Sequence, residues 1–205
     1  HTKLVTTQNG GKIDLETVRF SLNASSITSP EIRGGGISLS ATGAGGNIDL
    51  FGDLLISTSG PSEIRLAAPQ GQIRLDDTEI RAAGAVLNVG ARGVSSLFDT
   101  TVAAATINHT GTGAATNIIL RETDDLNSSG IVSNAGIIDL KLAARDSRLA
   151  LDSGQLGSNG AGKDILLLVG DLDFKGGNGT VFGTGQLTIQ PPETVWTVPQ
   201  TRATG

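Results

Sequence analysis

Short runs of alternating apolar and polar residues fill this chain, and Gly, Asn, Ser and Asp separate them. The stretch Gly136–Gln190 is the clearest example, with strand-sized runs at 137–142, 165–169 and 187–189. Alternation places every second side chain on the same face, which is typical of half-buried β-strands. The pattern therefore predicts an all-β protein in which turns divide many short strands.

One short unit recurs along the chain: a polar or small residue, Ile, a second residue, and then Leu. Its clearer copies begin about every 23 residues, which is the spacing of a stacked coil with one rung per repeat. Further apolar runs between the copies predict two or three strands per rung, and about eight or nine rungs in all. The copies lie at Lys12–Leu15, Gly36–Leu39, Asn47–Leu50, Glu63–Leu66, Gln72–Leu75, Asn117–Leu120, Ile137–Leu140, Asp164–Leu167 and Gln186–Ile189.

The composition favours a narrow aliphatic interior. Hydrophobic residues make up 38% of the chain, but there are only five Phe, one Trp and no Tyr or Met. A large globular core usually contains aromatic volume, whereas stacked Ile, Leu, Val and Ala suit a slender coil. A β-propeller blade would need a repeat of about 40 residues. An antiparallel meander would be expected to show tight two-residue hairpins.

The stretch Leu140–Leu151 is the best helix candidate, because good helix formers there partly fit a period of 3.6. It also fits a strand, a turn at 145–147 and a second strand, and the neighbouring units favour this interpretation. Pro191 and Pro192 end the repeats. We therefore predict a single β-solenoid domain over 1–190 and a linker or end-capping tail over 191–205, which contains the lone Trp196.

Charge and cysteine content exclude several classes of partner. The net charge is −5 and no cysteine is present. Nucleic acid binding needs clustered Lys and Arg, so we expect no nucleic acid partner. The sequence has no apolar run of membrane-spanning length, so we expect no direct membrane insertion. It also shows no leader peptide and no initiator Met, which is consistent with a piece of a longer protein.

Two phrases carry a resemblance to a known family. Gly-Asn-Ile-Asp-Leu at 46–50 and Gly-Gln-Leu-Thr-Ile-Gln-Pro at 185–191 resemble the β-helical repeats of filamentous-haemagglutinin-like exoproteins and related bacterial surface adhesins. The resemblance implies a right-handed parallel β-helix that is secreted or displayed at the cell surface as a stalk or adhesive rod. It implies a host-cell or matrix glycan or protein receptor as partner, together with neighbouring modules of the same polypeptide.

Acidic pairs occur at Asp76-Asp77 and Asp124-Asp125. Such pairs could serve as catalytic carboxylates or as Ca²⁺ ligands, but Asp is also common in solvated turns, which is the interpretation we favour. Two basic sets could form stripes that bind an acidic polysaccharide, although acidic neighbours favour simple solubilisation of a sheet face. These basic sets are Arg65, Arg74, Arg81 and Arg92, and Lys141, Arg145 and Arg148.

His1 and His109 are the only histidines, and neither has a carboxylate at ligand spacing. We therefore assign no catalytic, metal-binding or cofactor-binding residue and expect a non-catalytic module. The alternatives are a polysaccharide lyase or glycoside hydrolase on the same scaffold, or a carbohydrate-binding module. An enzyme would need charged side chains from neighbouring rungs in one groove. A carbohydrate-binding module would show exposed Trp or Tyr.

Overall fold

The computed structural model describes residues 3–5, 11–24, 30–58, 60–94, 97–112, 117–174 and 180–192. All regular structure in these residues is β, and none of them belongs to a helix that could span a membrane. The strands are β1 (Lys3–Val5), β2 (Lys12–Thr17), β3 (Phe20–Asn23), β4 (Glu31–Gly34), β5 (Gly36–Ala41), β6 (Ile48–Thr58), β7 (Glu63–Val94), β8 (Leu97–His109), β9 (Ile118–Glu122), β10 (Leu126–Ser133), β11 (Ile138–Leu142), β12 (Arg148–Ser158), β13 (Ile165–Leu168), β14 (Asp171–Asp173), β15 (Thr180–Phe182) and β16 (Leu187–Gln190).

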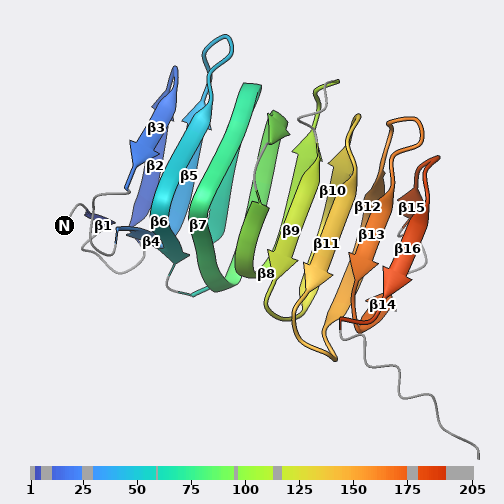
Figure 1. Cartoon of the computed structure of the whole chain (residues 1–205). Coiled ribbons are helices and arrows are strands. Elements are labelled where there is room, and N and C mark those ends of the chain that lie inside the picture. Colours follow the sequence, from blue (N-terminus) through green and yellow to red (C-terminus); the bar gives the residue numbers. More distant parts are fainter. Residues whose placement is uncertain are drawn as a thin grey trace, which may run out of the picture.

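The strands stack in parallel to form a β-solenoid of about seven turns (Figure 1). Strands pair in parallel with strands of the neighbouring turns, as when Ile37 pairs with Ile64, 27 positions later. The predicted all-β parallel solenoid is therefore confirmed. The number of turns is somewhat smaller than the expected eight or nine.

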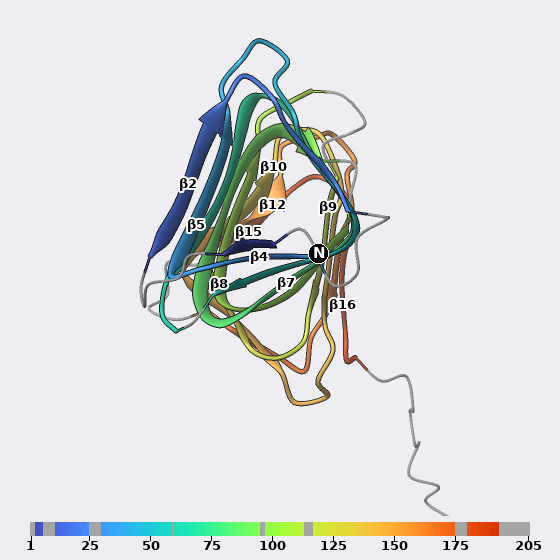
Figure 2. The same ribbon diagram turned by 90° about the vertical axis from the view of Figure 1, so that its left-hand side faces the viewer.

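Each turn passes over three faces (Figure 2). Face 1 holds β1, β4, the second half of β6 and segments of β7, β8 and β9. Face 2 holds β2, β5, segments of β7 and β8, then β10, β12, β14 and β15. Face 3 holds β3, the first half of β6, a segment of β7, then β9, β11, β13 and β16. Seen from the N-terminal end, the chain runs clockwise as it recedes, so the coil is right-handed (Figure 2).

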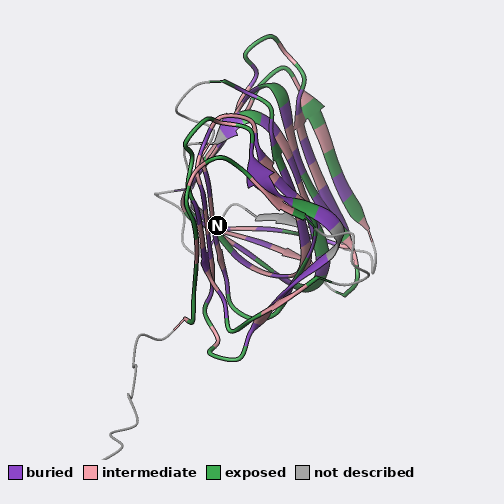
Figure 3. Ribbon diagram, turned by 90° about the vertical axis from the view of Figure 1, so that its right-hand side faces the viewer, coloured by how far each residue is buried: buried purple, intermediate pink, exposed green. Residues whose placement is uncertain are grey.

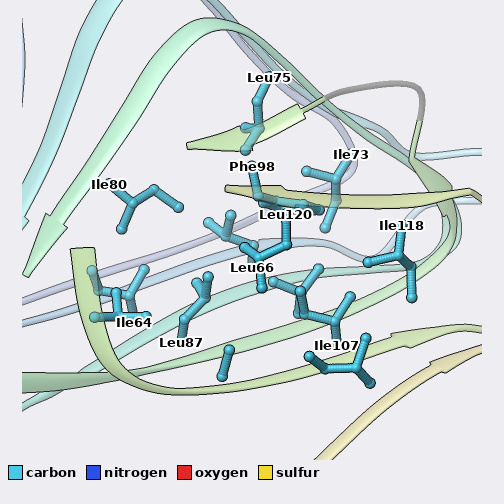
Figure 4. Packing of buried hydrophobic residues seen from close by; sticks show 14 of the residues in the cluster. Ile64, Leu66, Ile73, Leu75, Ile80, Leu87, Phe98, Ile107, Ile118 and Leu120 are labelled. Carbon is cyan, nitrogen blue, oxygen red and sulfur yellow. The ribbon is translucent and has the colours of Figure 1, made fainter. Parts of the chain in front are cut away.

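The core is one cluster of buried side chains that runs along the coil. Residues in register stack on each other, for example Ile37 on Ile64 and Ile48 on Ile73, and all four are at most 2% exposed. Ile64, Ile73 and their neighbours point into the interior (Figure 4), and buried and exposed positions alternate along the strands (Figure 3). Phe98 is the only aromatic residue among the buried core members that the structure describes.

The repeated units of the sequence fall into two columns on different faces. Ile13 pairs with Ile37 and then Ile64 on face 2. On face 3, Ile48 pairs with Ile73, and in later turns Ile118, Ile138, Ile165 and Leu187 pair in order. The repeat starts that the sequence gives at 118, 138, 165 and 187 are thus confirmed as register partners.

The segment with some helical character forms two strands joined by a turn, as the neighbouring units predicted. β11 ends at Leu142 and β12 begins at Arg148. Between them, the hydroxyl of Ser147 donates a hydrogen bond of 2.6 Å to the carbonyl oxygen of Ala144. β11 pairs in parallel with β9 and β13. This pairing favours the strand, because it uses the backbone N–H and C=O groups that a helix would need for its own hydrogen bonds. The predicted tail has only 191 and 192 among the described residues, so Trp196 lies outside them.

Candidate ligand-binding face

The outer side of face 2 carries three depressions in a line. The first has a volume of about 430 Å³, the second of about 300 Å³ and the third of about 270 Å³. Strands β2, β5 and β7 line the first, β7 and β8 the second, and β8 and β10 the third. The three depressions cross successive turns, so this face presents an extended surface rather than one closed pocket.

The first depression owes its shape to small residues between longer ones. The register aligns Lys12 with Gly36, and Asp14 with Ser38, and Ser38 then aligns with Arg65. Gly36 and Ser38 have little side chain, and they line the depression together with the longer Lys12, Asp14 and Arg65.

The second depression continues directly from the first, because both are lined by Glu63 and Arg65. Asn88 donates a hydrogen bond of 2.8 Å from Nδ2 to Oε1 of Glu63, which fixes this wall. Ala67 and Gly90 contribute to its lining. A Cβ added at Gly90 would meet no atom within 4 Å, so the space above this glycine is open.

Polar side chains at the end of face 2 surround the third depression. Asn108, Thr110, Asn134 and Asn159 contribute to its lining. Asn134 donates from Nδ2 to the carbonyl oxygens of Thr110, at 3.4 Å, and Gly111, at 3.3 Å. These amides and hydroxyls offer both donors and acceptors to a polar ligand.

His109 also contributes to this third depression, although it is fully buried. It follows the alternation of β8 to an inward position, where Ala91 precedes it and Ser133 follows it in register. This histidine therefore lies in an inward column of face 2, between Ala91 and Ser133. His1 lies outside the described residues.

The charges of the first depression balance each other. Lys12 and Arg65 are positive, and Asp14 and Glu63 are negative. Arg65 is exposed and forms no ion pair with any residue that the structure describes. A surface of this kind does not select a strongly charged polymer, but it can donate hydrogen bonds to neutral hydroxyl groups and accept hydrogen bonds from them.

No binding stripe forms from Arg65, Arg74, Arg81 and Arg92, because the first three side chains lie on three different faces. Nε of Arg74 lies 2.7 Å from Oδ1 of Asp49 on face 3. Nη2 of Arg81 lies 2.8 Å from Oε2 of Glu79 on face 1. The turn length separates these arginines, since their spacing of seven to nine residues is about one third of a turn.

The second basic set is also dispersed. Lys141 lies near the end of β11, in register with Arg121. Arg145 is exposed in the turn before β12. Arg148 begins β12 on face 2, where its Nη1 lies 3.5 Å from Oδ2 of Asp173. These three cations therefore do not form a single binding stripe.

The acidic pairs lie at exposed corners. Asp76 and Asp77 stand between faces 3 and 1, and Asp77 has a φ of 50°, a turn conformation that Asp tolerates. Asp124 and Asp125 lie at the start of β10, where Oδ1 of Asp125 accepts a hydrogen bond of 2.7 Å from the backbone of Arg148. Within the described ranges, no group of three or more acidic or histidine side chains is placed to hold a metal ion.

A residue that sequence reasoning missed is Glu122, which is buried at 1% exposure. It occupies an inward position of face 1, between Thr100 and Leu142 in register. Burial raises the pKa of this carboxyl to about 7, although hydrogen bonds from Thr100, Thr123 and Val102 oppose the shift. The strand alternation through Ile118 and Leu120 already placed Glu122 on the inner side, and this signal could have identified it.

Comparisons with known proteins identify no relative. No protein-family model matches the chain, and neither the curated proteins nor the solved structures gave a match.

Proposed function

We propose that this chain is a structural and adhesive β-solenoid module of a large secreted or cell-surface bacterial protein, similar to filamentous-haemagglutinin-like exoproteins. The observation that carries the proposal is the line of three depressions on the outer side of face 2. A rod with a hollowed polar side can hold an extended polymer across several turns. The resemblance at 46–50 and 185–191 supports the assignment to an exported adhesin.

The proposed ligand is an extended neutral glycan of a host cell or matrix. The balanced charges of Lys12, Asp14, Glu63 and Arg65 favour hydroxyl groups over sulfate or uronate groups. Asn88 and Thr106 continue the polar lining into the second depression. Shallow polar surfaces bind weakly per site, so contact over several turns supplies the avidity that adhesion needs.

A glycan array with the full chain tests the proposal, and Gly90→Tyr is the decisive variant. The new side chain has open space at its Cβ and fills the second depression without displacing the strand. We expect Gly90→Tyr to lower glycan binding at least about tenfold. Ser21→Tyr is the matched control, because Ser21 is exposed on face 3 and pairs with Asp49 there. Equal binding by both variants and the unmodified chain, or no binding to any glycan, would refute the proposal.

One observation favours a second candidate, a polysaccharide-active enzyme. Asp14 and Glu63 come from different turns and line the same depression, together with Lys12 and Arg65. Glycoside hydrolases usually use two carboxylates that flank the scissile bond of a sugar chain. Release of reducing ends or unsaturated products from a bound polysaccharide would favour this candidate, provided that Asp14→Asn and Glu63→Gln abolish the release. Binding without such products favours the adhesive module.

A further inference from the structure

One outward column on face 2 places a hydrogen-bonding side chain on each of five successive turns. Parallel pairing of β2 with β5, β5 with β7 and β7 with β8 keeps these positions in register. Within β7, the backbone N–H of Val86 donates to the carbonyl oxygen of Ser62 at 2.9 Å, which sets Asn88 beside Arg65. The column consists of Asp14, Ser38, Arg65, Asn88 and Thr106, and all five residues are exposed or half-buried.

The side chains of this column keep hydrogen-bonding groups available for a ligand. Four of the five form no side-chain hydrogen bond or ion pair with any residue that the structure describes, and the exception is Asn88, whose Nδ2 donates to Glu63. On face 3, by contrast, outward neighbours pair with each other, as Arg74 does with Asp49 at 2.7 Å. Exposed groups without a protein partner can exchange hydrogen bonds with water for hydrogen bonds with a ligand.

The first two depressions follow this column along the coil. Three members of the column line the first depression and three line the second, and Arg65 belongs to both. Gly36, Ala67 and Gly90 lie beside the column on the same outer surface, where their small size leaves room. The hollow therefore runs from turn to turn, parallel to the coil axis, and every turn along it offers one polar side chain.

The spacing of the column favours one shape of ligand. Neighbouring parallel strands lie about 4.8 Å apart, so the polar side chains recur at this interval along the coil axis. A hexose chain with β-1,4 linkages is joined through equatorial bonds, so it is extended and advances by nearly this distance per ring. An α-1,4-linked chain curves into a helix and leaves a straight line after a few rings. A β-1,4-linked chain can therefore place one ring over each turn.

We propose that face 2 binds an unbranched, neutral β-1,4-linked hexose chain along the coil axis, with one ring over each of the five turns that carry the column. This inference rests on the proposed function and adds the linkage and the direction of the glycan. Ser38 and Thr106 lie three turns apart, so they contact different rings of the same chain. Each ring contributes little by itself, and the contributions accumulate along the chain.

Calorimetric titration of the full chain with oligosaccharides of two to six rings tests this proposal. The probes are β-1,4-linked oligosaccharides of glucose and of N-acetylglucosamine. In at least one of the two series, we expect the affinity to rise about three- to tenfold with each added ring, up to five rings. The α-1,4-linked glucose hexamer should bind no more tightly than a β-1,4-linked dimer, because it cannot follow the column.

Ser38→Ala and Thr106→Ala distinguish a chain along the axis from one that crosses the coil. Each variant should lower the affinity for the β-1,4-linked hexamer about three- to tenfold, because an axial hexamer contacts both turns. A dimer can occupy the turns that a variant leaves intact, so its affinity should change by less than about twofold. Ser21→Ala is the matched control, because it removes a hydroxyl from an exposed position on face 3.

An affinity that stops rising after two or three rings would overturn the axial chain. So would a hexamer whose binding responds to only one of the two variants, and equal binding of the α- and β-linked hexamers would overturn the linkage. Binding to other glycans of the array but to neither β-1,4-linked series would overturn this inference alone. Absence of binding to every glycan would overturn it together with the proposed function.

Discussion

Oγ1 of Thr100 donates a hydrogen bond of 2.7 Å to Oε2 of Glu122 inside the coil. The two residues are register partners on face 1, and each is 1% exposed. The backbone amides of Val102, at 3.1 Å, and Thr123, at 2.9 Å, also donate to this carboxyl. Solenoid stacking thus places this carboxyl between Thr100 of the preceding turn and Leu142 of the following turn, and Thr100 and Val102 of the preceding turn donate hydrogen bonds to it.

The first prediction concerns pH. Because burial raises the pKa of Glu122 to about 7 from 4.5, the folded chain holds this proton more tightly than the unfolded chain. The contribution of protonated Glu122 to the free energy of unfolding is complete below pH about 4.5. It falls as the pH rises towards about 7 and then levels off. Its size is at most about 3 kcal/mol. Chemical unfolding at a series of pH values measures it.

Glu122→Gln is the control for this pH dependence, because it removes the titration and keeps the side-chain shape. Other carboxyl groups titrate equally in both proteins. The difference in unfolding free energy between Glu122→Gln and the unmodified chain should therefore change between pH about 4.5 and 7. Parallel curves over this range would show that Glu122 titrates normally.

The second prediction concerns the hydroxyl of Thr100. Thr100→Val keeps the shape but removes the donor to Glu122, and an unsatisfied buried charge is costly. We expect a loss of about 1–3 kcal/mol at pH 8, where Glu122 is ionised, and a smaller loss at pH 5. Thr100→Ser retains the hydroxyl and should show no such difference between the two pH values. Equal losses at both pH values would point to packing alone.

The third prediction compares two glycines. A Cβ at Gly71 would lie 2.1 Å from the carbonyl oxygen of Gly46 in the preceding turn, so Gly71→Ala forces the two turns apart. We expect a loss of about 2 kcal/mol or more. A Cβ at Gly90 would meet no atom within 4 Å, so Gly90→Ala should leave the free energy of unfolding unchanged or raise it by up to about 1 kcal/mol. Thermal and chemical unfolding measure the stability of both variants. Similar losses of stability in Gly71→Ala and Gly90→Ala would contradict this account.

The fourth prediction concerns the aliphatic core. Ile64 is fully buried and stacks on Ile37. Ile64→Ala should lower the free energy of unfolding by about 2–5 kcal/mol, and Ile64→Val by about 0.5–1.5 kcal/mol. Val86 is 39% exposed on face 2, so Val86→Ala is the surface control and should cost well under the core value. Similar losses for Ile64→Ala and Val86→Ala would be inconsistent with the register described for face 2.

The alternation and the repeat length are local properties, and they were sufficient to predict parallel stacking. The starts at 118, 138, 165 and 187 are register partners because residues of like position in each repeat stack on one another. The turn at 145–147 was likewise predictable, since small and polar residues there interrupt two apolar runs.

Only the tertiary structure decided which side chains meet. The units at Ile13 and Ile48 look alike in sequence, yet they lie on faces 2 and 3. Arg65, Arg74 and Arg81 are separated for the same reason, because the angle at each corner depends on turn geometry that the alternating pattern does not encode. Whether Glu122 meets Thr100 depends on the register between turns about 22 residues apart, which is set by stacking along the whole coil. The sequence therefore determined the class of fold, and the stacking of turns determined the depressions of face 2.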